Sequence, residues 1–313
     1  MLTSTAVTYI ALSVSGTGGE VRRSPHSDAE ARVTCDWTQP KACLAAVGPP
    51  PPSYGVRYET TSGLSWTIEV TTAWAPPYAT RFWALSNIGY HVGAPFYRVD
   101  YANASTRFVV QFGYRSEPAV DALWDAETTL NTTWSVHAPG NVRGSVAFSM
   151  NAAAPGEPHG PGTNPNCTDP TYCAVGFSTN IFINYGDNTR LNAPGFSVFG
   201  TVSEAGMAEN GVDALYGGYG ECIELCGKGC CSDVVPCTAA CGDRVGEGKS
   251  ESGRAVGGAL RGDGVDPYCR FNRAGVCKGV SLTQMLNASA PSYLEAFPRL
   301  DRVKRVTVVV REA

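Results

Sequence analysis

Charged side chains are scarce in this 313-residue chain: Asp, Glu, Lys and Arg make up 17% of it, and the formal net charge is −4. A partner that is bound through its phosphate backbone requires a basic face, so this composition argues against nucleic acid. Long apolar runs are also lacking, since none approaches the roughly 20 residues of a membrane-spanning helix. We therefore expect neither a nucleic-acid partner nor a membrane span.

The N-terminal region is poor in core-forming sequence. The short apolar run 6–14 has no basic segment ahead of it, so it fits either a weak signal peptide or the start of an incomplete sequence. The prolines at 49–52 should be extended and semi-rigid. We expect residues 1–54 to be a poorly ordered leader, followed by one domain over 55–313.

Cysteine is plentiful, in contrast: there are twelve, an even number, mostly in short-spaced pairs. Such usage is typical of oxidised proteins. Cys35 and Cys43 could close a small loop, and so could Cys167 and Cys173. Four N-x-Ser/Thr sequons point to the same compartment. They are Asn103, Asn131, Asn166 and Asn287. We expect a disulfide-bonded glycoprotein of the secretory lumen or extracellular space, with the cytoplasm as the alternative.

Six of the cysteines lie between Cys222 and Cys241, at the start of a Gly-rich tract without apolar periodicity. Their spacing lacks the paired C-x2-C knuckles of a zinc ribbon, and no histidine lies nearby to complete a ligand set. Disulfides are therefore favoured over zinc, and we predict no metal site. We interpret residues 221–268 as an insertion that interrupts the domain.

The rest of the chain has the pattern of short strands. Trp66, Ile68 and Val70 alternate with polar residues, which predicts a half-buried strand with 56–59 as its hairpin partner and a turn at Gly63. Further strands are predicted at 96–99, 108–112, 142–150, 181–184, 196–202 and 303–310.

Only two helices are predicted. Pro76 and Pro77 open the first, at a position where proline is tolerated, and Gly89 ends it. The second covers 206–216. Many short antiparallel strands with two short helices indicate a mainly β protein, either a barrel or a sandwich.

Two segments, 96–113 and 180–188, combine one cation, several amides and many apolar residues, but no evident nucleophile. Such a set suits the recognition or isomerisation of a peptide better than hydrolysis. Twisting an X–Pro bond past its barrier of about 18–20 kcal/mol requires a positioned charge rather than a covalent intermediate.

With these segments, the sequence resembles the cyclophilin-type peptidyl-prolyl isomerases, particularly their bacterial-like branch. The matching pieces, in the family's order, are WTIEVTTAWAPPYATRFWAL, FYRV, FVVQFG, GSVAFSM, NIFINYGDNTRL, GFSVFGTV, ALYGGYGE and YLEAFPRLDRVKRVTV. The resemblance implies a closed eight-stranded antiparallel β-barrel capped by two helices, with a peptide groove on its outer face.

The resemblance also implies the roles of individual residues. Arg98 would be the catalytic cation and Gln111 its catalytic companion, which positions the peptide backbone together with Asn180. The residues that it assigns to substrate binding alongside Asn180 are Phe108, Val109, Phe182, Leu191 and Phe196. No cofactor is implied, the partners would be proline-containing peptides or client proteins, and a monomer is expected.

The chain departs from the family between Arg98 and Phe108, where nine residues replace a short turn. If these residues do not loop out between paired strands, Arg98 is displaced and activity fails. Arg190 and Phe196 stand where many eukaryotic members carry tryptophan and histidine. Alternatives therefore stay open: Arg98 as a strand arginine that covers apolar surface, an impaired cyclophilin-fold binding module, or a disulfide-rich structural protein.

Overall fold

A computed structural model describes residues 33–99, 108–130, 139–150, 176–208, 210–217, 280, 282–286, 290–295 and 297–310. The sequons, the predicted Cys167–Cys173 loop and the cysteine-rich insertion at 221–268 lie outside these residues. So do the inserted residues 100–107. Within the described part, no helix is long and apolar enough to cross a bilayer.

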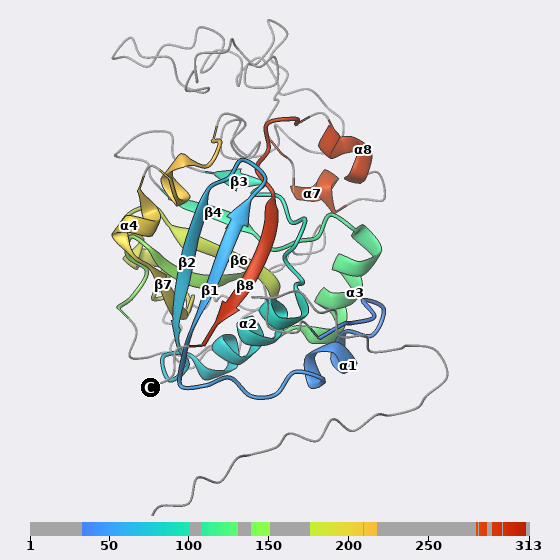
Figure 1. Ribbon diagram of the computed structural model, residues 1–313, viewed down its shortest axis with the longest axis horizontal. Coiled ribbons are helices and arrows are strands. Elements are labelled where there is room, and N and C mark those ends of the chain that lie inside the picture. Colours follow the sequence, from blue (N-terminus) through green and yellow to red (C-terminus); the bar gives the residue numbers. More distant parts are fainter. Residues whose placement is uncertain are drawn as a thin grey trace, which may run out of the picture.

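Eight strands form one curled antiparallel sheet (Figure 1). The strands are β1 (Ser53–Thr60), β2 (Ser65–Thr71), β3 (Arg98–Val99), β4 (Val109–Phe112), β5 (Ser145–Met150), β6 (Phe177–Asn184), β7 (Val198–Val202) and β8 (Val303–Val309). Their order is β3-β4-β6-β5-β7-β2-β1-β8. The protein is thus mainly β, as the sequence predicts, with β3 and β8 at the two ends of the sheet.

The prediction of a closed barrel is wrong, because the end strands do not form a ladder with each other. Instead, the segment before β3 meets the segment before β8 through an isolated bridge between Pro95 and Arg302. Three backbone hydrogen bonds of 2.8–2.9 Å join residues 93–96 to 301–303. These bonds flank the Pro95–Arg302 pair on both sides, so the two ends of the sheet touch over a few residues without extending into a ladder between β3 and β8.

The first hairpin follows the alternation read from the sequence. In β2, Trp66, Ile68 and Val70 are buried while their neighbours are half-buried. β2 pairs with β1 over the whole of 53–59, and Gly63 in the turn has a positive φ of 87°. The predicted C-terminal strand is likewise confirmed as β8, which pairs with β1.

Helix α2 (Pro76–Ile88) begins and ends where the sequence predicts. Two prolines occupy its first turn, and Gly89 ends it in the left-handed region, with φ 70°. The N–H groups of Gly89 and Tyr90 donate to the carbonyls of Ser86 and Leu85, which satisfies two terminal acceptors. Its buried face lies against the main core, where α2 contacts β7 and β8.

The prediction of one helix over 206–216 is wrong. The segment holds the short α4 (Glu204–Met207) and a separate 3-10 turn, η2 (Val212–Ala214). Ser203 caps α4 by accepting from the Gly206 N–H at 3.2 Å, and α4 ends after a single turn.

Several further helices were not predicted from the sequence. They are α1 (Pro40–Ala45), α3 (Pro118–Thr128), the 3-10 turn η1 (Thr189–Leu191), α7 (Leu282–Met285) and α8 (Ala290–Glu295). Helix α1 lies next to α2 and α3 (Figure 1). The Cys35–Cys43 disulfide is present in this segment, so the small loop suggested by the sequence is closed.

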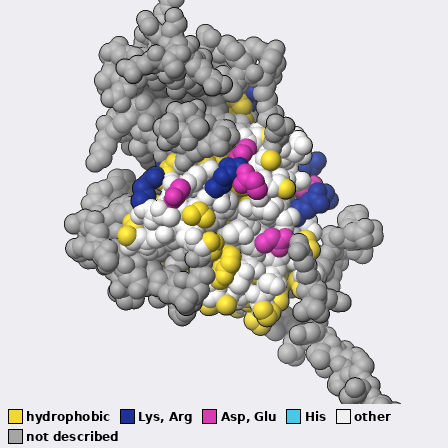
Figure 2. All heavy atoms as spheres, turned by 90° about the vertical axis from the view of Figure 1, so that its left-hand side faces the viewer, with side chains coloured by type: hydrophobic (Ala, Val, Ile, Leu, Met, Phe, Trp, Pro, Cys, Tyr) yellow, Lys and Arg dark blue, Asp and Glu magenta, His cyan; other side chains and the backbone are white. Residues whose placement is uncertain are grey.

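Two hydrophobic clusters stabilise the sheet. The larger one fills the space between the sheet and α2, and includes Tyr58, Phe82 and Phe112. A smaller cluster joins α7 and α8 to Tyr97 and Tyr114. Over α4 and β7 the surface is mixed: Figure 2 shows Lys and Arg side chains next to Asp and Glu, with hydrophobic side chains in separate groups.

Candidate functional site

Three of the predicted site residues form one row across adjacent strands. Arg98 of β3 lies opposite Gln111 of β4, and Gln111 lies opposite Phe182 of β6. Directly opposed residues in an antiparallel pair project on the same face of the sheet. The intervening residues Phe112 and Ile181 therefore face the other way, into the main core. The row brings a cation, an amide and an aromatic ring together on one face.

The inserted residues do not separate the two strands that flank them. Arg98 pairs with Gln111 and Val99 with Val110, so β3 and β4 form a ladder on either side of 100–107. Phe108, which follows the insertion, lies with its ring centroid 4.9 Å from the Arg98 guanidinium carbon. Arg98 and Phe108 therefore lie close together despite the nine residues between them.

Gln111 connects the cation to the neighbouring strands. Its Oε1 lies 3.5 Å from Arg98 Nη1, at the outer limit of a hydrogen bond, and its Nε2 donates to Ser149 Oγ at 2.8 Å. Gln111 is 7% exposed and Arg98 is half-buried. Ser149 lies in β5 and was missed from the sequence, because an isolated serine in an apolar run carries no functional signal of its own.

The apolar residues of the predicted site also gather here. The rings of Phe182 and Phe196 meet edge to face at 5.7 Å between centroids, and the Phe196 N–H donates to the Leu191 carbonyl at 3.2 Å. Their exposed fractions are small: Val109 3%, Phe182 4%, Phe196 7% and Leu191 8%. Phe108 is half-buried and is the most exposed of this apolar group.

Asn180 lies two residues before Phe182 in β6, on the same face of that strand, but it is not open to solvent. Its side chain is fully buried, and its Oδ1 accepts a hydrogen bond of 3.0 Å from the Tyr97 hydroxyl. Tyr97 is adjacent to Arg98 in the chain and packs in the smaller hydrophobic cluster. Through its hydrogen bond with Tyr97, Asn180 is placed to support the strand that carries Arg98. Direct contact with a peptide, as expected from the sequence, stays a prediction.

Buried asparagines hold the loop between β6 and β7, another feature that sequence reasoning missed. Asn188 Nδ2 donates to the Phe108 carbonyl at 2.8 Å, and Asn141 Nδ2 donates to the Phe196 carbonyl at 2.9 Å. Asn184 connects the two, since its Nδ2 donates to Asn141 Oδ1 and its Oδ1 accepts from Asn188. Two backbone carbonyls of the site are fixed by this network. The asparagines of NYGDN were its visible signal.

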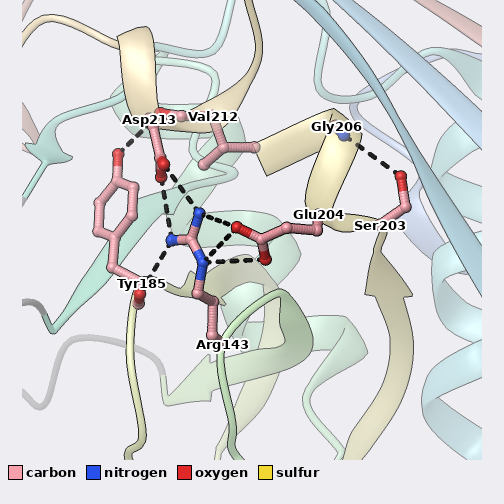
Figure 3. A network of polar contacts seen from close by, with 7 residues as sticks. All are labelled: Arg143, Tyr185, Ser203, Glu204, Gly206, Val212 and Asp213. Atoms are coloured by element: carbon pink, nitrogen blue, oxygen red, sulfur yellow. Dashed lines mark hydrogen bonds and ion pairs between the residues drawn. The ribbon is translucent and has the colours of Figure 1, made fainter. Parts of the chain in front are cut away.

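Arg143, just before β5, is the centre of an ion-pair network (Figure 3). Its guanidinium binds Glu204 at 2.7 Å and Asp213 at 2.8 Å, and its Nη1 donates to the Tyr185 carbonyl at 3.1 Å. These two carboxylates raise the pKa of Arg143 because they stabilise its charge. The network joins α4 and η2 to the end of β6, so this arginine is structural.

A second cation, exposed where Arg98 is half-buried, lies near Phe108. The guanidinium carbon of Arg190, in η1, is 4.5 Å from the centroid of the same ring that Arg98 approaches. Two arginines from different elements therefore share one aromatic neighbour. In the part of the chain that the structure describes, no cluster of three or more His, Cys, Asp or Glu could hold a metal ion.

No protein-family model matches the chain, and no curated protein sequence matches it. Among solved structures, the chain is similar to a cyclophilin type peptidyl-prolyl cis-trans isomerase from Cryptosporidium parvum. The similarity has a TM-score of 0.33 and a sequence identity of 17%, and it covers 49% of this chain and 78% of that one. A TM-score of this size carries no argument about function.

Proposed function

We propose that this chain is a peptidyl-prolyl cis–trans isomerase that acts on X–Pro bonds of client proteins. The observation that carries the proposal is the cross-strand row of Arg98, Gln111 and Phe182, which is assembled although nine residues separate Arg98 from Phe108. The sequence resemblance to the bacterial-like cyclophilins adds to it.

In the proposed mechanism, Arg98 acts on the amide as it twists. Rotation localises a lone pair on the proline nitrogen, and a guanidinium N–H can donate to that nitrogen as conjugation is lost. The arginine is useful only if its charge is held in place beforehand. Gln111 meets this need, because it contacts Arg98 through its oxygen and is itself anchored to Ser149 through its nitrogen.

The apolar neighbours are suited to hold the proline ring while the preceding residue rotates. Phe108 is the most exposed among them, and Phe182 and Phe196 form a packed pair. Asn188 and Asn141 keep the carbonyls of Phe108 and Phe196 in place. We propose these residues as the substrate site, with Asn180 and Tyr97 supporting Arg98.

The proposal is tested by replacing Arg98 and measuring exchange between the cis and trans forms of an Ala-Ala-Pro-Phe peptide by NMR, without a coupled protease. We expect the wild-type chain to accelerate exchange and Arg98→Ala to lower kcat/KM by about 100-fold, the effect of removing one preorganised donor. Arg98→Lys should also be impaired, because an ammonium lacks the planar fork of donors.

Arg57→Ala is the matched control, because it removes an exposed arginine of β1 that pairs with Glu59 and is not a residue of the proposed site. It should retain the wild-type rate. Unfolding midpoints of all variants are compared, so that loss of fold is separated from loss of activity. Equal acceleration by wild type and Arg98→Ala would contradict the proposed role of Arg98.

A second candidate is a catalytically impaired binding module on the same fold, because Phe182, Leu191 and Phe196 are buried and leave little surface to hold a rotating proline. In that case the peptide binds without accelerated exchange. Background exchange rates for the wild-type chain, together with peptide-induced NMR shifts, would support this candidate instead.

We further propose that the protein works in an oxidising compartment, the secretory lumen or the extracellular space. The Cys35–Cys43 disulfide supports this location, since such bonds are rare in reducing compartments. Mass spectrometry of the mature protein, for glycans and free thiols, tests the location.

A further inference from the structure

Phe108 is approached by two guanidinium groups from different parts of the fold. Arg98 of β3 lies 4.9 Å from the ring centroid, and Arg190 of η1 lies 4.5 Å from it. A cation at this distance is attracted by the electron-rich face of the ring. Arg190 is exposed, so it reaches solvent at the edge of the proposed proline site.

The backbone around Arg190 is fixed to the site. The Asn188 side chain donates to the Phe108 carbonyl at 2.8 Å, and the Asn188 N–H donates to the Asn141 carbonyl at 2.8 Å. Asp187 accepts from the Thr189 N–H at 3.0 Å, which begins the turn that carries Arg190. These bonds hold the start of the Arg190 side chain at a constant position relative to Phe108.

Arg190 also differs from other described arginines in its charge environment. Arg143, Arg115 and Arg305 each form an ion pair of 2.6–2.8 Å with a carboxylate. No ion pair between described residues involves Arg190. Asp187, three residues before Arg190 in the sequence, accepts instead from the Thr189 N–H at 3.0 Å. Within the described part of the chain, no carboxylate therefore occupies the Arg190 guanidinium, which leaves it available for an anion.

We propose that Arg190 makes this site selective for proline peptides that carry an acidic side chain next to the proline. The inference rests on the proposed function, because it takes Phe108 as a wall of the proline site. A peptide whose proline lies against Phe108 brings the adjacent side chain within reach of Arg190. A carboxylate can then accept two parallel hydrogen bonds from the guanidinium, and a lysine at the same place is repelled.

The test uses peptides Ala-X-Pro-Ala and Ala-Pro-X-Ala, with Glu, Gln or Lys at X, and measures kcat/KM for cis–trans exchange by NMR. In one of the two series, the wild-type chain should favour Glu over Gln by about two- to five-fold, the size of an exposed ion pair. The preference should vanish in Arg190→Gln and weaken in 1 M NaCl. Comparing the variant with the wild type cancels the intrinsic effect of X on the exchange rate.

Arg57→Gln is the control, because it removes the same charge from β1 and should keep the preference. Equal Glu and Gln values for the wild type, with exchange still accelerated, would overturn the acidic selectivity and leave the isomerase intact. If the wild type accelerates exchange in none of the peptides, the isomerase proposal fails. The selectivity is then decided by the dissociation constants of the same peptides. Tighter Glu binding that Arg190→Gln abolishes would support it; equal or absent binding would overturn it.

Discussion

At the scale of single residues, His91 shows how burial sets a charge. Its imidazole is almost completely buried, with Nδ1 2.8 Å from the Tyr58 hydroxyl and Nε2 2.9 Å from the Thr179 carbonyl. A carbonyl can only accept, so Nε2 carries the hydrogen and Nδ1 accepts from Tyr58. Burial lowers the pKa of His91 to about 4 because the charged form loses its hydration.

This lowered pKa predicts a loss of stability in acid. Below pH of about 6.5 an unfolded chain protonates His91 while the folded chain does not, so the free energy of unfolding falls as the pH drops from about 6.5 to about 4. The full loss is about 3 kcal/mol. Urea unfolding measured across this range should therefore decline more steeply for wild type than for His91→Gln. Parallel curves for the two proteins would contradict the prediction.

Asp121 provides a control with the opposite sign. Burial raises the pKa of this carboxyl to about 6, so its contribution to the free energy of unfolding falls as the pH rises from about 4 to about 6. Asp121→Asn should remove that decline. The difference in free energy of unfolding between Asp121→Asn and wild type should therefore change with pH in the direction opposite to that of His91→Gln.

At the scale of elements, the approach of β4 to β6 depends on Gly113. This glycine follows β4 with φ 137°, and a Cβ atom on it would lie 2.5 Å from the Thr179 carbonyl oxygen and 2.7 Å from Asn180 Cα. Both atoms belong to the backbone of β6, which cannot move aside without disturbing the row that holds Phe182. The close packing of the two strands therefore excludes every side chain at this position.

We expect Gly113→Ala to destabilise the fold by about 3 kcal/mol or more, from the backbone strain of a positive φ together with the contact to β6. Gly63→Ala is the matched control, since Gly63 also has a positive φ, 87°, but no atom within 4 Å of the added Cβ. Its cost should be about 1 kcal/mol. The loss of stability in each variant is measured from its midpoint of denaturant unfolding. Equal losses for the two variants would contradict a close β4–β6 contact.

At the scale of the whole molecule, the sheet is completed by the two ends of its sequence. β8 pairs with β1 at positions some 250 residues away, from Gly55 with Val309 to Glu59 with Arg305. Val303 and Val306 of β8 are buried in the main core. The backbone hydrogen bonds between 93–96 and 301–303 also require the segment that leads into β8.

Truncation tests this dependence. We expect a chain that ends at Leu300 to lose cooperative thermal unfolding, because β1 loses its partner and the core loses two valines. A chain that ends at Val310 keeps all of β8 and should melt like the full chain. Thermal unfolding of the two truncated chains is followed by circular dichroism. A sharp transition in the shorter chain would mean that β8 is dispensable.

How far the site could be predicted depended on the kind of signal. Arg98, Gln111 and Phe182 were identified by resemblance. Their position on one face depends on the register between strands, whereas alternation in the sequence predicts faces only within a single strand. Ser149 and the asparagine network were missed, because their role depends on which strand becomes a neighbour. Asn180 was expected to position a peptide, which stays a prediction; its hydrogen bond with the Tyr97 hydroxyl could not be read from the sequence.

The sequence by itself determined the local elements: the alternation of β2, the proline start and glycine end of α2, and the β-branched run of β8. Those features depend on neighbours within a few residues, where backbone geometry and side-chain period act directly. Only the tertiary structure decided that the sheet stays open between β3 and β8, that β3 and β4 pair across the insertion, and that Arg190 shares Phe108 with Arg98. Each of these is a contact between segments that the chain brings together from a distance, so no local pattern encodes it.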